Sequence, residues 1–183
     1  MPAFSTRSRY GAVAQCLHWL TAILVVTAFT FGPGGSEQRV YSSAVDFDRQ
    51  LHETLGLCVL ALVLVRLVWR VFDTRPEDAL ISDRVKFLSK ALQIALYALL
   101  VAVPLTAIAG AWLEGHPLTL LGNAAIGPFL APSPSFGQSI ASIHTWLGDA
   151  ILWVAGGHAA AALYHHFVLK DRVLLSMLPG RDR

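Results

Sequence analysis

Seven histidines stand in a chain of 183 residues that is 55% hydrophobic and only 14% charged. An ionisable side chain at membrane depth is costly unless it is paired, ligated or facing water, so these histidines need a chemical explanation. His144 and His158 are fourteen residues apart, close to four helical turns, which would place both on nearly one helix face, about 21 Å apart. That spacing suits two stacked metal-containing groups, because neutral imidazole is a common metal ligand.

The composition indicates a lipid bilayer as the solvent, because the long apolar stretches are apolar nearly all round. The net charge of +2 is small and the basic residues form no long basic face, so no nucleic-acid partner is indicated. Cys16 and Cys58 stand in no Cys-x-x-Cys-His arrangement, which argues against covalent haem attachment and against a disulfide framework. We expect both to be buried small apolar residues.

Four apolar runs are each long enough to cross a hydrocarbon core of about 30 Å. They cover about residues 12–31, 51–72, 87–113 and 140–169. Turn residues or charged segments separate them. The sequence therefore predicts an all-α integral membrane four-helix bundle that forms one domain over residues 1–183. No signal-peptide pattern precedes the first run, so we expect this span to be retained.

The basic residues predict the orientation of the bundle, because cytoplasmic loops carry an excess of Lys and Arg. They gather before the first run (Arg7, Arg9), around the second connection (Arg70, Arg75, Arg84, Lys86) and after the fourth run (Lys170, Arg172, Arg181, Arg183). The other two connections hold Arg39 and Arg49 with Glu37, Asp46, Asp48 and Glu114. Both termini are therefore predicted to be cytoplasmic.

This orientation pairs four histidines by depth. His18 lies early in the first helix, near the cytoplasmic side, and His52 lies at the start of the second, near the outside. Because the fourth helix runs inward, His144 should be level with His52 and His158 level with His18. A single histidine of this kind is more often a hydrogen-bonded core residue. Four that agree in depth and face favour two bis-histidine b-type haem sites between facing helices.

Arg66 follows His52 by fourteen residues, which places it on the same face at the inner level. We expect it to pair with a haem propionate, although an arginine that snorkels to the cytoplasmic interface is an equal alternative, and Arg70 is expected to be one. Gly56 and Gly148 each lie four residues after a paired histidine. They would leave room for a flat macrocycle or serve ordinary close helix packing.

The remaining histidines carry weaker signals. His165 and His166 follow at the cytoplasmic end of the fourth helix, where they could relay protons or line a quinone pocket. A solvated interfacial histidine is the more common case. His116, in an outer loop, is expected to be exposed.

Four segments carry a family resemblance: "GGHAAAALYHHFVLKDRVLLSMLP" at the end, "LHW" in the first helix, "LHETLG" in the second and "IHTWLG" at the start of the fourth. In this order they resemble the bacterial cytochrome b561 family, whose members include the superoxide oxidase that reduces ubiquinone. The resemblance covers nearly the whole chain. It implies a multi-pass protein of the bacterial inner membrane with two haem b groups, whose ligand positions fall on His18, His52, His144 and His158.

The resemblance also implies an oxidoreductase reaction. Superoxide outside would give its electron to the outer haem, the inner haem would be reduced in turn, and ubiquinone would collect two electrons. No catalytic residue is indicated, and electrostatic capture of superoxide would rest on Arg39 and Arg49.

Two other functions use the same features. The first is a haem-bearing subunit that exchanges electrons between quinone and a separate dehydrogenase, hydrogenase or reductase; the sequence names no such protein partner. The second is a histidine-lined transporter or metal carrier without haem, which the pairing of histidines at two discrete depths disfavours.

Overall fold

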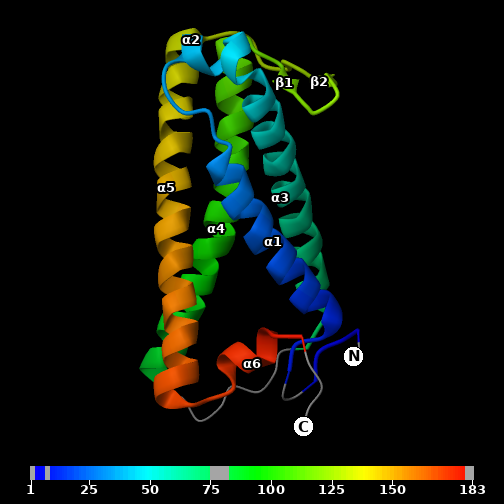
Figure 1. Ribbon diagram of the computed structural model, residues 1–183, viewed down its shortest axis with the longest axis vertical. Helices are drawn as coiled ribbons and strands as arrows, with labels where there is room; N and C mark the ends of the chain where they lie inside the picture. Colours follow the sequence, from blue (N-terminus) through cyan, green and yellow to red (C-terminus); the bar gives the residue numbers. More distant parts are fainter. Residues whose placement is uncertain (1–2, 7–8, 75–82, 180–183) are drawn as a thin grey trace.

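Four long helices form the body of the protein, confirming the expected helical fold (Figure 1). The computed structural model describes residues 3–6, 9–74 and 83–179. The long helices are α1 (Ala12–Thr30), α3 (Asp46–Phe72), α4 (Asp83–Glu114) and α5 (Pro134–Tyr164).

Three of these helices begin earlier than hydrophobicity alone predicts. The helix expected from about residue 51 starts at Asp46, the one expected from about residue 87 already includes Asp83, and the one expected from about residue 140 starts at Pro134. Their first turns are polar but favourable, since acidic side chains stabilise a helix N-terminus and proline suits the first helical position. At the other end, α5 gives way to the π-helical turn η2 (His165–Leu169).

Three segments of the described chain are long and apolar enough to cross a membrane: Ala12–Thr30, Ser43–Phe72 and Arg84–Glu114. Helix α5, with 31 residues, has the length but is not among these three segments. Large apolar side chains point outward from the bundle, as with Val26 and Trp153. This outward distribution is expected where lipid replaces water.

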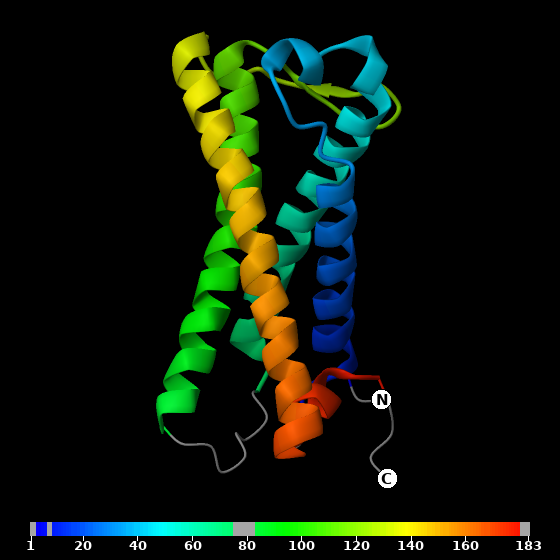
Figure 2. The same ribbon diagram turned by 60° about the vertical axis from the view of Figure 1, so that its left-hand side comes forward.

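The helices pack as two pairs, α1 against α3 and α4 against α5, with a smaller contact between α3 and α4 (Figure 2). The buried core is small and lies where the pairs meet. It consists of Val59 and Val63 of α3, Leu100 of α4 and Ile151 of α5. The histidines lie toward the two ends of the bundle from this core.

The end of the bundle opposite the terminal segments is called the outer end, and the other the inner end, after the orientation predicted from the sequence. The outer end carries structure that the sequence did not predict. It contains α2 (Glu37–Val40), the 3-10 turn η1 (Ser43–Val45) and an antiparallel hairpin of β1 (Leu118–Thr119) and β2 (Ala125–Ile126). Two hydrogen bonds join the hairpin to α3. Gln50 Nε2 donates to Asn123 Oδ1 at 3.2 Å, and the Leu121 amide donates to Thr54 Oγ1 at 3.0 Å.

At the opposite end the short helix α6 (Val173–Met177) crosses below the bundle (Figure 1). The Tyr10 amide and Gln15 Nε2 both donate to the carbonyl oxygen of Ser176, at 3.2 and 3.1 Å. Trp19 Nε1 donates to the carbonyl of Met177 at 2.8 Å. The described N-terminal and C-terminal segments therefore lie at the same end of the bundle. Four residues used to predict orientation lie outside the described residues: Arg7, Arg75, Arg181 and Arg183.

The prediction that both cysteines are buried is wrong. Cys16 and Cys58 are exposed on the outside of α1 and α3. A thiol is a small apolar group that tolerates a lipid-facing position as well as a core position, so the sequence could not separate the two.

The outer crossing of α4 and α5 depends on close backbone approach at Gly137. A Cβ at this position would lie 2.8 Å from the backbone nitrogen of Glu114. We expect Gly137→Ala to lower the free energy of unfolding by about 1–3 kcal/mol, because the helices must move apart. Thermal unfolding in detergent, followed by circular dichroism, measures the change. Gly156→Ala is the control, since its Cβ meets open space, and equal melting temperatures for the two variants would contradict the packing argument.

Candidate functional site

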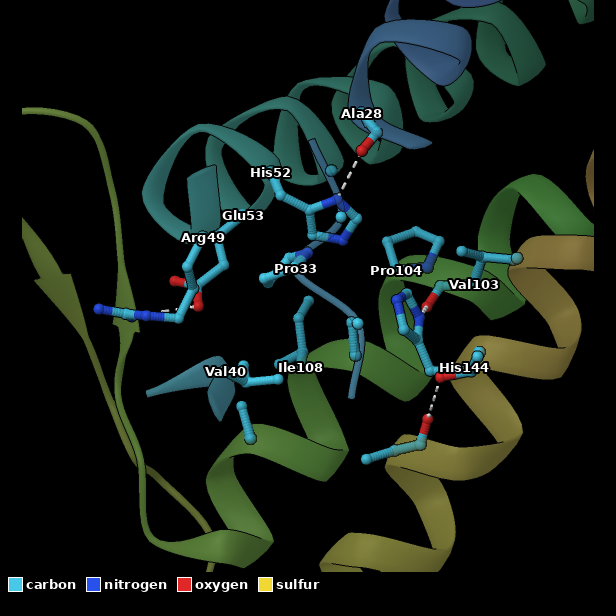
Figure 3. A pocket seen from close by; sticks show the side chains of 18 of the residues that line it. Ala28, Pro33, Val40, Arg49, His52, Glu53, Val103, Pro104, Ile108 and His144 are labelled. Atoms are coloured by element: carbon cyan, nitrogen blue, oxygen red, sulfur yellow. Dashed lines mark hydrogen bonds and ion pairs between the residues drawn. The ribbon is translucent and has the colours of Figure 1, made fainter. Parts of the chain in front are cut away.

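His52 of α3 and His144 of α5 face each other across a cavity at the outer end (Figure 3). Their ring centroids are 6.0 Å apart and the ring planes are nearly perpendicular, at 81°. The two residues come from different helix pairs. The facing arrangement is therefore set by the packing of the whole bundle.

A backbone carbonyl orients each of these rings. His52 Nδ1 lies 2.7 Å from the carbonyl oxygen of Ala28, and His144 Nδ1 lies 2.9 Å from that of Val103. A carbonyl only accepts, so each Nδ1 carries the hydrogen and each Nε2 keeps a free lone pair. Ala28 lies in the last turn of α1, where helix carbonyls lack an intrahelical partner. Such an arrangement is typical of metal-binding histidines.

The second pair lies toward the inner end. His18 of α1 and His158 of α5 have ring centroids 6.3 Å apart and planes at 75°. The guanidinium of Arg66 interacts electrostatically with both rings. The structure thus brings the four histidines together in the two expected pairs and puts Arg66 beside the inner one; their ligation of iron stays a prediction.

Arg66 shares its aromatic partner with a second arginine. The Cζ atoms of Arg66 and Arg70 lie 5.5 and 5.3 Å from the centre of the Tyr97 ring. Arg70 Nη2 also donates to Gln93 Oε1 of α4 at 3.3 Å, and its expected position at the cytoplasmic interface stays a prediction. No carboxylate of the described residues pairs with either arginine. Two cations near the inner pair are therefore available to an acid group.

The distance between the ring centres distinguishes two imidazoles joined by a direct hydrogen bond from two imidazoles that bind one metal between them. Two imidazoles joined by a direct hydrogen bond would have centres about 5 Å apart. Two nitrogens bound to one metal at about 2 Å, each about 1.1 Å from its ring centre, give about 6.2 Å. The observed 6.0 and 6.3 Å match the second geometry. No group of three or more His, Cys, Asp or Glu within the described chain could hold a metal ion. The pairs suit a metal whose other ligands come from a cofactor, as in haem.

The cavity around the outer pair has a volume of about 890 Å³, large enough for a sizeable organic group. Gly56 and Gly148 line it, and a Cβ added to either would meet no atom within 4 Å. These glycines therefore face open space. Of the two roles considered for them, room for a flat group fits and close helix packing does not.

Arg49 lines the end of the cavity near α2, which also includes Glu37 and Tyr41 and is called the mouth below. Several contacts hold the Arg49 side chain in place there. It is 8% exposed, forms ion pairs with Asp46 and Glu53, and donates to Thr119 Oγ1 at 3.0 Å. Its Cζ also lies 5.4 Å from the ring centre of Tyr41. The positive charge of Arg49 is thus already compensated by neighbouring carboxylates.

His116 is half-buried at this mouth, so the prediction of an exposed residue is wrong. Its ring stacks on Tyr41 with centroids 3.5 Å apart, and its Nε2 lies 3.1 Å from Glu37 Oε1. Hydrogen bonds from His116 and Gln138 hold the pKa of Glu37 below its ordinary value. Burial, reinforced by the Glu114 carboxylate, raises the pKa of Tyr41. These groups and the neutralised Arg49 make the mouth polar and on balance acidic.

Two further histidines lie beyond α5. His165 Nδ1 is 2.5 Å from Asp171 Oδ2. Partial desolvation acts to raise the pKa of Asp171, but hydrogen bonds from His165 and from the Val173 amide hold it below its ordinary value. His166 contacts the Phe167 ring edge-on. The expected proton-relay or quinone role of these two histidines stays a prediction.

Long apolar helices that hold two imidazole pairs, each with room for one metal between the rings, are typical of one class of protein. This class is the helical membrane cytochromes that carry electrons on b-type haem. The chain belongs to one family of that class, prokaryotic cytochrome b561, whose family model matches residues 9–180. This confirms the family predicted from the sequence motifs.

The relatives match along nearly their whole length. Cytochrome b562 of Cereibacter sphaeroides is 33% identical over 179 residues, covering 94% of this chain and 96% of that protein. Cytochrome b561 homolog 1 of Escherichia coli is 30% identical over 182 residues, with 95% and 99% covered. The probable superoxide oxidase CybB of Yersinia pestis is 29% identical over 177 residues, with 94% and 97% covered.

Proposed function

We propose that this protein is a di-haem cytochrome that moves electrons from superoxide at the outer face to ubiquinone in a bacterial inner membrane. The observation that carries the proposal is the separation of the two imidazole pairs, which leaves room for one metal in each. His52 and His144 would hold the outer haem, and His18 and His158 the inner one. Each haem, when bound, accepts and releases one electron.

The protein's own residues prepare these sites. The carbonyls of Ala28 and Val103 keep the outer imidazoles in the tautomer with Nε2 free. Gly56 and Gly148 leave the cavity open beside them. Arg66 would neutralise a propionate of the inner haem, because its positive charge acts on both rings of the inner pair and no carboxylate of the described residues pairs with it.

The stoichiometry follows from the electron count. Each superoxide gives up one electron and becomes dioxygen. One ubiquinone takes up two electrons and two protons and becomes ubiquinol. Two superoxide molecules are therefore consumed for each quinone, and storing electrons on two centres permits this conversion from one-electron to two-electron chemistry.

The proposed topology has four spanning helices and both termini in the cytoplasm. The basic residues Arg9, Lys170 and Arg172 lie in the terminal segments, which share one end of the bundle. Clustering of Lys and Arg at one end supports a cytoplasmic position for it. Helix α5 would be the fourth span, since it packs along α4.

One observation favours the alternative, a subunit that exchanges electrons between quinone and a separate dehydrogenase, hydrogenase or reductase. Of the two outer arginines, Arg49 is neutralised, and only Arg39 is exposed to attract an anion. An acidic mouth would instead attract a basic surface of a partner protein. The name of the Yersinia pestis relative supports superoxide as the electron donor.

Superoxide consumption tests the proposal directly. The purified protein in detergent should accelerate superoxide loss when a water-soluble ubiquinone is present and should form one quinol for every two superoxide molecules. Stopped-flow absorbance follows both species, with heat-inactivated protein as control. Acceleration that does not depend on quinone, or a rate equal to the control, would leave only the subunit function.

Each haem should depend on its own histidine pair. We expect His144→Ala and His158→Ala each to lower the haem content from two to about one per chain, since one lost ligand opens one site. Pyridine haemochrome analysis gives the ratio, and His116→Ala is the control because that ring lies at the mouth, stacked on Tyr41. A ratio of two in either ligand variant would refute the assignment.

Arg66 should raise the midpoint potential of the inner haem, because a positive charge stabilises the added electron. We expect Arg66→Leu to lower that potential by on the order of 50 mV. Arg66→Lys, which retains a positive charge, should lower the potential much less. Spectroelectrochemical titration measures the potentials, and the inner haem is the one absent from His158→Ala. Identical titrations for wild type and Arg66→Leu would exclude the propionate role.

A further inference from the structure

The connection between α1 and α3 lies across the outer end of the bundle (Figure 1). Residues 33–41 of this connection, called the strap below, contain α2 (Glu37–Val40), and nearly all of them line the cavity of the outer histidine pair. Just before the strap, Gly32 lies against that pair, since a Cβ at this position would be 3.5 Å from ring atoms of His52. The strap therefore covers the outer side of the cavity.

The strap is attached to the rest of the bundle mainly through one carboxylate. In the described chain its backbone hydrogen bonds stay within the strap or join it to Ser42, the next residue. Glu37 Oε1 accepts from His116 Nε2, which follows α4, and Glu37 Oε2 accepts from Gln138 Nε2 of α5, both at 3.1 Å. These two are the hydrogen bonds that link the described strap to other elements. The stack of Tyr41 on His116 and its contact with Arg49 add to them.

The charge of Glu37 keeps this attachment in place at neutral pH. Hydrogen bonds from His116 and Gln138 hold the pKa of Glu37 below its ordinary value. The closed arrangement is therefore stabilised above the ordinary pKa and is lost as the pH falls through the lowered one. None of the other charged groups at the mouth forms a hydrogen bond with Glu37: Arg39 of α2, Asp46, Arg49 and Glu53 of α3, and Glu114 of α4.

Two glycines at the start of the strap provide a hinge. Gly34 and Gly35 have φ angles of +26° and +112°, in the region that favours glycine. A Cβ added to Gly34 would meet no atom within 4 Å, so packing does not hold the backbone at this point. Lids move about a few such loop residues, which absorb the change in backbone angles. The strap can therefore swing from the cavity once the bonds of Glu37 break.

We propose that the strap is a gate over the outer histidine pair, which Glu37 holds closed and whose opening admits a small electron donor to the outer centre. The inference rests on the proposed function, because a donor finds an electron acceptor here only when the outer pair holds its haem. Water replaces the two hydrogen bonds of Glu37 when the gate opens, so opening costs little. How often these bonds break then sets how often a donor reaches the centre.

Distances between two spin labels test the movement of the strap. One label is placed on Gln38→Cys in the strap and the other on Ile94→Cys of α4, since both positions are exposed. Cys16 and Cys58, which are exposed as well, are changed to alanine. Pulsed electron paramagnetic resonance of the reduced protein should give one narrow distance distribution with Glu37 present. In Glu37→Gln a second, longer component should appear, and an unchanged distribution would overturn the inference.

The rate at which dithionite reduces the outer haem tests access to the cavity. The outer haem is the one lost in His144→Ala. Stopped-flow absorbance should show about threefold faster reduction in Glu37→Gln, on the scale that an exposed ion pair contributes. Asp48→Asn is the matched control, because it removes an outer carboxylate that forms no hydrogen bond or ion pair with a described residue. It should leave the rate nearly unchanged, and an equal acceleration in Asp48→Asn would show a charge effect on the anionic reductant instead of a gate.

Gln138→Ala removes one of the two hydrogen bonds and replaces Glu37→Gln if that variant does not fold. It should shift the distances and the rate in the same direction by a smaller amount. Longer distances without faster reduction would also refute the gate, because the strap would then move without limiting access. The spin-label distances need no haem, so they test the strap even if the purified protein lacks haem, a result that would refute the proposed function itself.

Discussion

The separation of two imidazoles across the bundle is the constraint on which the rest of the structure depends. In both pairs one ring comes from α5 and the other from the α1 and α3 pair, so the two halves of the bundle must stay about 6 Å apart at the ring centres. Helices that packed tightly along their whole length could not do this. The buried core is accordingly confined to a few side chains around Val63, and glycines face open space where other bundles would fill it. The protein gives up apolar contact between its halves, and a bound cofactor would supply the missing contact surface.

The features that could be predicted from the sequence are those that follow from helix repeat and bilayer thickness. The spacing of fourteen residues between His144 and His158 predicts that both lie on one helix face at two different depths. The distribution of Lys and Arg among the loops then predicts which histidines share a depth. The features that could not be predicted depend on contacts between connections or on the backbone. The carbonyls of Ala28 and Val103 orient two rings, yet any residue carries a carbonyl, so they leave no signal. His116 was expected to be exposed because nothing in the sequence links its loop to Tyr41, which lies 75 residues earlier.

Helix α5 illustrates how function lowers the hydrophobicity by which a membrane helix is recognised. It supplies one histidine to each pair and the cavity glycine Gly148. Each of these residues replaces an apolar side chain, so α5 is absent from the segments that are apolar enough to span a membrane by composition. The cost falls on the surfaces that face the interior of the bundle. The outward side of the same helix stays apolar and aromatic, with Trp146 and Trp153 strongly exposed.

The charges of the bundle are also distributed unequally along its axis, and on the proposed assignment this sets a direction for electrons. Acidic side chains gather at the mouth of the outer cavity, where Arg49 is neutralised by Asp46 and Glu53. The inner pair has Arg66 beside it, with Arg70 on the same tyrosine. Negative charge destabilises an added electron and positive charge stabilises it, so an electron has a lower free energy at the inner pair. The gradient is built from fixed side chains in a medium of low dielectric, where charge separations of this size act strongly. With the proposed haems bound, it would favour transfer from the outer pair to the inner pair, the direction that oxidation of an external donor requires.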